Sequence, residues 1–320
     1  MEQSKKRQNM IKAAKLYYFG NMSQDEIASM MEISRPKVSR LLAEARQLNI
    51  VQITIHDSSQ SLDSMADTLR EHFHLRHVSV VPSGNSEEAA KVNVGRAGSD
   101  FLNSLLRPGL RIGISWGTTL LAFSREFRAR MPVPTAQVVQ LLGGTYSKEL
   151  DIDARDLVKT LADKLSCEAS LLQAPLIVSN PALHELLMKE PAMVQHFRRM
   201  RELDVAFVGI GTAHSAKTSL IYQANYITPE EADSLRSDGY ICDICSRLLL
   251  PDGSAPENCL ANRVMGVTLE NLRSIPLVVG LCTGNRKVPS VQAALRNGCI
   301  NSLIIDEVAA IGLMAAEKLE

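Results

Sequence analysis

Residues 23–46 read SQDEIASMMEISRPKVSRLLAEAR and predict two short amphipathic helices separated by a tight turn. Ser23 stands three residues before Glu26, the spacing of a capping box, in which the hydroxyl and the carboxylate each accept a backbone N–H. Residues 32–33 are expected in the turn. Pro36 falls in the first turn of the second helix, where its missing N–H costs nothing. The pattern is typical of a helix-turn-helix and makes DNA the first partner to consider.

The second of these helices has an apolar stripe on one side and a basic face on the other. In a helix-turn-helix the second helix enters the major groove, where Arg and Lys bind guanine edges or phosphates and Ser can reach either. An ordinary helical hairpin with a solvated basic face is the alternative that these residues leave open. The predicted DNA contacts are Ser34, Arg35, Lys37, Ser39 and Arg40.

Charge is distributed unevenly along the chain. Residues 1–55 hold nine Lys and Arg against five Asp and Glu, a net charge of +4, whereas the 320 residues together have a net charge of zero. The remaining residues are therefore net acidic, and this separation suits phosphate contact at one end only. Residues 50–55 (IVQITI) alternate like a half-buried strand and are expected to form a wing or a strand leading out of this region.

Bulk composition describes an ordinary globular protein of two or more domains. No apolar run approaches the roughly 20 residues that span a bilayer, and the basic N-terminus has no apolar segment behind it, so a cytoplasmic protein without a membrane partner is expected. Of the six cysteines, only Cys242 and Cys245 have a metal-like or redox-like spacing, and no second pair accompanies them. Reduced thiols, no metal and no cofactor are therefore expected.

From residue 77 onward, β-rich runs alternate with helical patterns, which predicts an α/β fold with an open, largely parallel sheet covered on both faces. The predicted domains are a helix-turn-helix at 1–56, a linker helix within 57–76 and an effector-binding and oligomerisation domain at 77–320. The linker helix is expected either to pack on that domain or to pair with a second subunit. The predicted strands are 77–81, 110–114, 137–142, 169–173, 204–209, 276–281 and 300–305, and the predicted helices lie near 87–106, 118–129, 153–165, 181–201, 229–237, 288–297 and 307–319.

Four loops rich in Gly, Ser or Thr follow predicted strands, at residues 115–119, 143–148, 209–212 and 282–287. Sites in open α/β sheets lie at the carboxyl ends of the strands, and such turns offer backbone N–H groups to an anion such as phosphate. Four converging loops are stronger evidence than one, provided that their strands are neighbours. Lys148, Arg286 and Lys287 are the candidate cationic partners. The dinucleotide and nucleoside-triphosphate fingerprints are absent from the sequence.

These blocks together resemble the SorC family of bacterial sugar-responsive transcription regulators, with the deoxyribonucleoside-regulator type the nearest. The resemblance covers nearly the whole chain. It is carried by residues 13–45, GISWGTT at 113–119, VVQLLGG at 138–144, DVAFVGIGT at 204–212, CDICSRLLLPDG at 242–253 and residues 283–310.

The resemblance implies a Rossmann-like sugar-binding domain similar to ribose-5-phosphate isomerase and glucosamine-6-phosphate deaminase, and a small phosphorylated sugar or polyol as effector. It also implies tetramers. Two departures concern the site: Leu142 stands where some relatives have a basic residue before Gly-Gly, and Cys242 where relatives often have glycine. Lys148 or Arg155 is expected to compensate for Leu142. Carried over by position, the effector contacts are Gly117, Thr118, Thr119, Gly143, Gly144, Asp243 and Lys287, with Lys148 added as a candidate.

The sequence supports two functions of different kinds. The first is an effector-gated DNA-binding regulator of a carbohydrate operon, a repressor or an activator, acting as a dimer or tetramer. The second is a sugar-phosphate isomerase or deaminase with an accessory DNA-binding head. Asp243 is the candidate base for such an enzyme, and His214 is the nearest histidine, but no pair of acid and base is evident. The regulator, without enzymatic activity, is therefore the predicted function.

Overall fold

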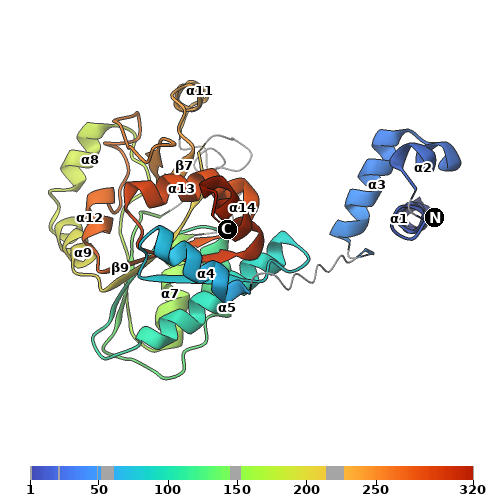
Figure 1. The fold of residues 1–320 in the computed structure, drawn as a ribbon. Coiled ribbons are helices and arrows are strands. Elements are labelled where there is room, and N and C mark those ends of the chain that lie inside the picture. Colours follow the sequence, from blue (N-terminus) through green and yellow to red (C-terminus); the bar gives the residue numbers. More distant parts are fainter. Residues whose placement is uncertain are drawn as a thin grey trace. The chain divides into compact units, whose positions relative to one another are not determined.

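The computed structural model describes residues 2–20, 22–48, 50–51, 61–144, 153–213 and 227–319, with the backbone alone at 2–5 and 47. They fall into two compact units, Met1–Ser59 and Gln60–Glu320. We call the first unit the head and the second the body, and each is described by itself (Figure 1). The predicted strand at 50–55 lies mostly outside the described residues.

The head contains three helices, α1 (Glu2–Tyr18), α2 (Gln24–Met31) and α3 (Arg35–Gln47). The predicted capping box is confirmed, since Ser23 Oγ accepts from Glu26 N at 3.3 Å and Glu26 Oε2 accepts from Ser23 N at 2.7 Å. The bond from Ser23 N, together with one that Ser23 Oγ donates to the same carboxylate oxygen at 2.8 Å, lowers the pKa of Glu26. Glu32 ends α2 in the left-handed conformation with φ of 54°, which turns the chain towards α3. The head has a small core of its own, formed by Met10, Ala13, Ala14, Ile27, Ala28, Val38, Leu41, Leu42 and Ala45.

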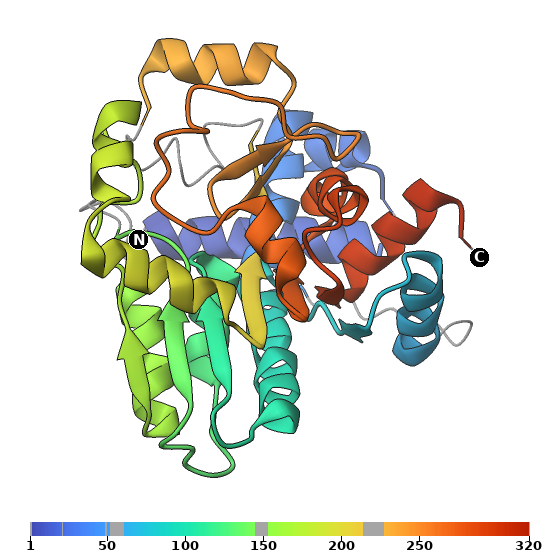
Figure 2. The same cartoon turned by 90° about the vertical axis from the view of Figure 1, so that its left-hand side faces the viewer.

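The body is built on a seven-stranded sheet in which all the pairings are parallel. Figure 2 shows the green strands β2 and β3 side by side in this sheet. The middle strands are apolar on both faces, as expected for a sheet covered from both sides. The order is β1 (His77–Val81), β10 (Ser302–Asp306), β9 (Leu277–Cys282), β5 (Val205–Gly209), β2 (Arg111–Ile114), β3 (Gln137–Gln140) and β4 (Glu168–Ser170).

Successive residues of a strand enter two different cores, one on each face of the sheet. Val138 and Phe207 pack into one core, whereas their neighbours Val139 and Ala206 pack into the other. This alternation follows from the period of two in a strand. The helices of the first core are α5 (Glu87–Leu105), α6 (Thr118–Glu126) and α7 (Ala154–Leu165), and those of the second include α4 (Leu62–His72), α9 (Pro191–Arg201), α12 (Leu269–Ser274), α13 (Val288–Asn297) and α14 (Glu307–Glu317).

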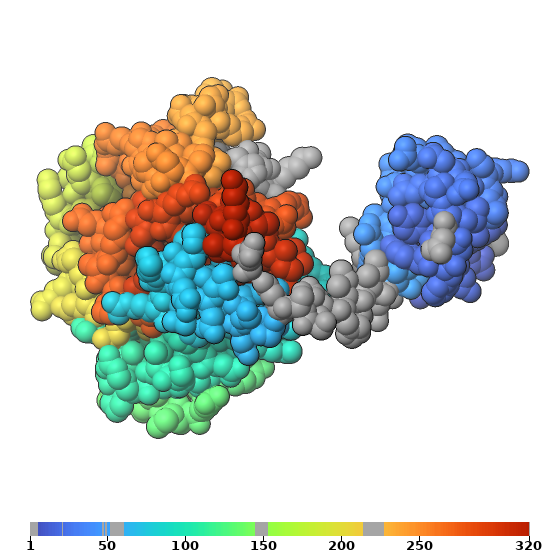
Figure 3. Space-filling view, in the orientation of Figure 1, coloured from blue at the N-terminus to red at the C-terminus, as the bar shows by residue number. Residues whose placement is uncertain are grey.

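The predicted linker helix is α4, and it belongs to the body. Met65 and Leu69 are buried in the second core, and His72 lies 3.5 Å from Glu317 of α14. The space-filling view shows the light-blue α4 and the red α14 on the same face of the body (Figure 3). Of the two alternatives for this helix, the structure therefore supports packing on the body.

Three parts of the body differ from the sequence prediction. Residues 181–201 form two helices, α8 (Pro181–Leu187) and α9, because Pro191 lacks the N–H that a continuous helix needs and begins the second one. The short helix α12 was not predicted. The third difference is a small antiparallel sheet, also unpredicted, of β6 (Gly211–Thr212), β7 (Cys242–Ile244) and β8 (Arg247–Leu249); α11 (Pro229–Ser237) precedes its second strand.

Candidate functional site

The four Gly-rich or Thr-rich loops follow β9, β5, β2 and β3, which are consecutive neighbours in the sheet. Because all these strands are parallel, the loops leave the same edge of the sheet. The chain runs outward from β2 to β3 and β4, then returns to β5 and runs in the other direction to β9 and β10. The point between β2 and β5 is therefore a topological switch point, where ligands of open α/β sheets bind.

The loop after β2 ends in the open N-terminus of α6. Gly117 is the N-cap residue of this nine-residue helix, has a φ of 133°, and no side chain caps the helix. A Cβ at Gly117 would meet no atom within 4 Å, so the space beside it is open. Thr118 and Thr119 form the first turn, whose N–H groups have no partner within the helix itself. Ser115 ties this loop to β5, since its Oγ accepts from Gly209 N at 3.3 Å.

The β7–β8 hairpin brings Asp243 to the same edge. Asp243 pairs with Gly211, directly after β5, and its side chain is buried with Oδ1 unpartnered. Burial raises the pKa of Asp243 to about 7, although the Ser246 backbone N–H and the charge of Lys287 act in the opposite direction. The carboxyl group is therefore poised to change its charge near neutral pH.

Three buried side-chain oxygens within the described ranges have no hydrogen-bond partner: Thr119 Oγ1, Asp243 Oδ1 and Ser246 Oγ. Buried polar groups are hydrogen-bonded in the great majority of cases, so each such atom calls for an explanation. Thr119 comes from the loop after β2, and the other two come from the hairpin that pairs with the segment after β5. Two hydroxyl groups, each able to donate and accept, and one carboxyl group lie at one edge of the sheet. They fit the hydroxyls and oxyanions of a small polar ligand.

The loop after β9 is held in place by a buried carboxylate. Asp306 Oδ1 accepts from Gly284 N at 2.7 Å, and Asp306 Oδ2 accepts from Ser83 Oγ at 2.6 Å. The loop continues into a 3₁₀ turn, η1 (Asn285–Lys287), where Lys287 is half-buried and Arg286 is exposed. Asp306 is not among the site residues predicted from the sequence. Its only signal was an acidic residue at the end of a largely apolar strand.

Gly143 and Gly144 do not offer free amides. Gly143 N donates to Met265 O and Gly144 N donates to Ala174 O, both at 2.8 Å. A Cβ at Gly143 would lie 2.3 Å from Pro175 O, so glycine is needed there for close backbone approach. This corrects the expectation that these two N–H groups are open to an anion.

Of the two cations expected to compensate for Leu142, only Arg155 lies within the described residues. A Cβ at Gly144 would lie 3.2 Å from Arg155 Nε, so this guanidinium is beside the end of β3 and is also bonded to Asp153. Lys148 lies outside the described residues, as does His214. Leu142 itself is fully buried.

On the head, the five predicted DNA contacts share one property: they are exposed along the start of α3. Ser34 is the N-cap residue of α3, and its side chain makes no capping bond. Arg35 Nε lies 3.7 Å from Asp25 Oδ2, in an exposed pair that is worth little and is easily exchanged for a phosphate. Lys6 and Glu44, 2.8 Å apart, connect α1 to α3. The exposed contacts are Ser34, Arg35, Lys37, Ser39 and Arg40.

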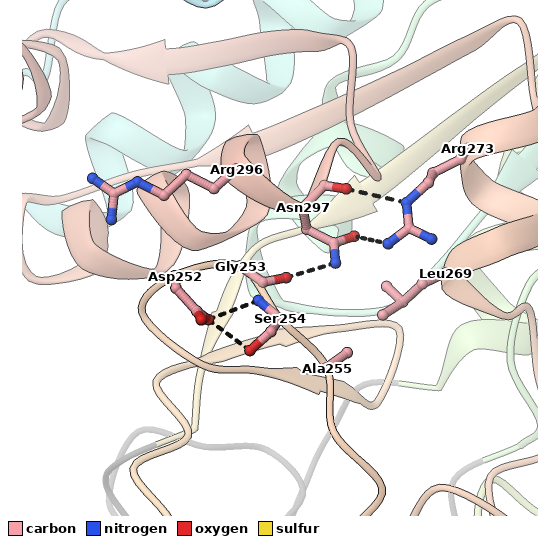
Figure 4. A pocket seen from close by; sticks show the side chains of 8 residues that line it. All are labelled: Asp252, Gly253, Ser254, Ala255, Leu269, Arg273, Arg296 and Asn297. Carbon is pink, nitrogen blue, oxygen red and sulfur yellow. Dashed lines mark hydrogen bonds between the residues drawn. The ribbon is translucent and has the colours of Figure 1, made fainter.

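A hollow of about 530 Å³ lies elsewhere on the body, between the turn after β8 and the ends of α12 and α13. Figure 4 shows Asn297 between Gly253 and Arg273. Its amide donates to Gly253 O at 2.7 Å, and its two oxygens accept from the Arg273 guanidinium at 3.1 and 2.9 Å. The polar lining is thus largely bonded to itself, unlike the unpartnered oxygens at the carboxyl edge.

The structure bears on three further predictions. All six cysteines are free, and burial raises the pKa of Cys282 to about 11 and that of Cys299 to about 12. Among the residues that the structure describes, no group of three His, Cys, Asp or Glu side chains is arranged to hold a metal. In the same part of the chain, no helix combines the length and the apolarity that crossing a membrane requires.

Comparison with known proteins places this chain among transcription regulators. The family described as "Putative sugar-binding domain" (Sugar-bind) matches residues 57–315. The "Deoxyribonucleoside regulator" of Bacillus subtilis (strain 168) is 29% identical over 310 residues, covering 97% of this chain and 98% of the relative. The "Sorbitol operon regulator" of Klebsiella pneumoniae is 30% identical over 314 residues, covering 95% and 96%. The crystal structure of full-length SorC from Klebsiella pneumoniae superposes with a TM-score of 0.73 at 27% identity, covering 97% of this chain and 99% of that one.

Proposed function

The chain belongs to the Sugar-bind family of SorC-like, sugar-responsive transcription regulators, and we propose that it controls a carbohydrate catabolic operon in response to a small phosphorylated sugar or polyol. The relatives that match along nearly their whole length are named as regulators, so the isomerase or deaminase alternative is set aside. We further propose that the body shares its sugar-phosphate site with isomerases and deaminases of similar fold. On this proposal the protein is cytoplasmic, where its operator lies.

The observation that carries the effector proposal is the set of unpartnered buried oxygens, Thr119 Oγ1, Asp243 Oδ1 and Ser246 Oγ. A bound sugar supplies the missing partners: its hydroxyls donate to Asp243 and exchange hydrogen bonds with Ser246 and Thr119. Leaving such groups buried without partners is unfavourable, so a ligand that satisfies them gains affinity and stabilises the body.

We assign the phosphate of the effector to the positively charged groups at the same edge of the sheet. The first turn of α6 presents the N–H groups of Thr118 and Thr119 beside the open space at Gly117, and a helix N-terminus favours an anion. Lys287, whose charge reaches Asp243, supplies a cation from the loop after β9. Gly117, Thr118, Thr119, Asp243 and Lys287 are therefore the proposed core of the site. Lys148 remains a candidate from outside the described residues.

The output is assigned to the head. We propose that α2 and α3 act as a helix-turn-helix, with the exposed residues at the start of α3 in the major groove. A symmetric dimer or tetramer would place two such helices on the half-sites of a pseudo-palindromic operator. The effector then shifts the equilibrium between an arrangement that fits the operator and one that does not. This mechanism serves a repressor or an activator equally well.

The direct test is a thermal-shift and calorimetric screen of the full chain against ribose 5-phosphate, 2-deoxyribose 5-phosphate, glucose 6-phosphate and sorbitol 6-phosphate, each with its unphosphorylated parent. We expect at least one phosphorylated compound to stabilise the protein and its parent to do so far less. The chain has a single tryptophan, Trp116, in the loop after β2, so its fluorescence reports binding directly. Equal binding of sugar and sugar phosphate would overturn the phosphate assignment.

A further inference from the structure

We infer that Arg247 is a positioning residue of the effector site: its guanidinium fixes the hairpin that carries Asp243 and Ser246 against the loop at the end of β3. The inference rests on the proposed function, because that function identifies the site as one that binds an effector. The contacts of Arg247 themselves do not depend on it. Arg247 lies on β8, immediately after the turn that contains Ser246.

The guanidinium of Arg247 binds backbone oxygens instead of a carboxylate. Nη1 donates to Ala261 O at 2.8 Å, Nε to Val267 O at 3.3 Å, and Nη2 to Val264 O and Gly266 O, both at 3.3 Å. Within the described ranges no carboxylate lies at ion-pair distance from it. Burial lowers the pKa of Arg247, but arginine stays charged at any ordinary pH. A rigid planar donor is thus used to hold one stretch of backbone.

That stretch, residues 261–267, lies across the end of β3, and we call it the strap. Gly143 N donates to Met265 O at 2.8 Å, and Val267 N donates to Leu141 O at 2.9 Å. A Cβ at Gly266 would lie 2.5 Å from Leu142 Cδ2, so the strap is seated closely on the strand end. Arg247 therefore connects the hairpin, through the strap, to the loop that begins at Gly143.

The hairpin itself needs such an anchor. Its turn residues Cys245 and Ser246 have φ values of 52° and 58°, a conformation that favours glycine or asparagine over cysteine and serine. Backbone strain of this kind persists only where the surroundings hold it, and it is concentrated at functional sites. Arg247 is the residue that follows this turn, and Ile244, which pairs with it, precedes the turn.

Arg247 acts through other residues and does not contact the effector. Four of the five N–H groups of Arg247 donate to backbone carbonyl oxygens of the strap, so the guanidinium is directed towards the strap. Its remaining accessible surface faces a small hollow of about 130 Å³, shared with Ser246 and Thr268. Loss of the guanidinium should therefore leave every proposed effector contact chemically intact and change only their relative positions.

The test compares Arg247→Met and Arg247→Lys with wild type and with Arg273→Met, which removes an exposed guanidinium whose hydrogen bonds, among the described residues, are to Asn297 alone. Amide hydrogen exchange and acrylamide quenching of Trp116 are measured on the full chain without ligand. We expect Arg247→Met to raise exchange at Gly143 and in residues 242–249 and to increase quenching of Trp116. Arg247→Lys should recover part of the loss, and Arg273→Met should match wild type.

The second readout is binding of the sugar phosphates named above. Arg247→Met should weaken binding on the order of tenfold, while the affinity of the ligand-free protein for operator DNA stays unchanged. Increased exchange confined to the strap, with Gly143, the hairpin and sugar-phosphate affinity as in wild type, would reduce Arg247 to a local clamp and overturn the inference. If wild type binds none of the four compounds, the proposed function fails, and the exchange and quenching data still decide the role of Arg247.

Discussion

In the head, the side chains proposed to bind DNA are exposed on one helix, whereas in the body most of those proposed to bind the effector are buried or half-buried and come from separate loops. The head needs only a small core of nine buried residues to present α3. The body uses a seven-stranded sheet and two cores to bring Thr119, Asp243 and Lys287 to one edge. A DNA-binding surface can thus be built from local sequence, but a small-molecule site depends on the whole topology.

The contrast between head and body depends most strongly on the proposal that the exposed face of α3 contacts DNA. The double variant Arg35→Ala/Arg40→Ala should weaken operator binding about a hundredfold, because each guanidinium that contacts a base or phosphate contributes roughly 1–3 kcal/mol. Fluorescence anisotropy with operator DNA at fixed salt measures this. The control Arg198→Ala/Arg201→Ala removes the same charge from exposed positions on α9 and should bind as wild type. Equal affinity of both variants for the operator would refute the assignment of α3.

The body should respond to a change that leaves the head untouched. Gly117→Ala places a Cβ at a φ of 133°, which costs on the order of 1–3 kcal/mol, and intrudes on the open space beside the first turn of α6. We expect at least tenfold weaker sugar-phosphate binding by calorimetry, with operator affinity unchanged in the absence of ligand. Gly109→Ala is the matched control, since Gly109 also has a positive φ and open space around it but follows α5. If both variants bind the sugar phosphate alike, the α6 assignment is wrong.

The burial of the effector site also predicts a pH dependence that the exposed head lacks. Because the pKa of Asp243 is raised to about 7, its carboxylate is mostly protonated at pH 6 and mostly ionised at pH 8. An ionised Asp243 accepts from sugar hydroxyls, so affinity should rise by about tenfold over this range, beyond the contribution of the phosphate with its own pKa near 6. Lys287 is the charged group nearby, and the thiols of Cys242 and Cys245 stay neutral because burial raises their pKa.

Asp243→Asn isolates this effect, since it keeps the phosphate titration and removes the carboxyl. Its affinity should vary less with pH than that of wild type, and a parallel pH profile would exclude Asp243 from the site. The stability of the native state changes with pH in the opposite direction to the affinity for the effector. A carboxyl group whose pKa is raised on folding stabilises the native state at low pH, and this contribution is lost as pH rises from about 4 to 7.

Sequence alone predicted the parts whose signals are local. The capping box at Ser23 and the exposed basic start of α3 are set by residues a few positions apart, and the four loops were identified because each follows an apolar run. The order of the strands could not be read in this way. The strands β9, β5, β2 and β3 are neighbours in the sheet although they are far apart in the chain. Whether the four loops form one site depends on this order.

The same reason explains the errors within the site. Gly143 and Gly144 carry the pattern of an anion loop, but their amides are taken by Ala174 and Met265, which lie far away in sequence. The β7–β8 hairpin escaped prediction because its strands have three residues each and its turn uses Cys245 and Ser246 in place of the usual glycine or asparagine. Asp306 likewise gains its role only from contacts with Gly284 and Ser83 across the sheet edge.

The smallest expected effect tests whether the two units are energetically separate. Ser23→Ala removes the capping box of α2, which should cost about 1 kcal/mol because the Glu26 N–H loses its partner. In a head whose core has only nine buried residues this is a large share of the stability, so we expect a lower melting temperature for the head and somewhat weaker operator binding. Ser61→Ala, which removes the matching cap of α4 in the body, should change sugar-phosphate binding and operator binding little and lower only the melting temperature of the body. Differential scanning calorimetry of the two variants separates these outcomes.

A common shift of one single transition would mean that head and body unfold together, and that the effector signal reaches α3 through a shared cooperative unit and not through repositioning of an independent one.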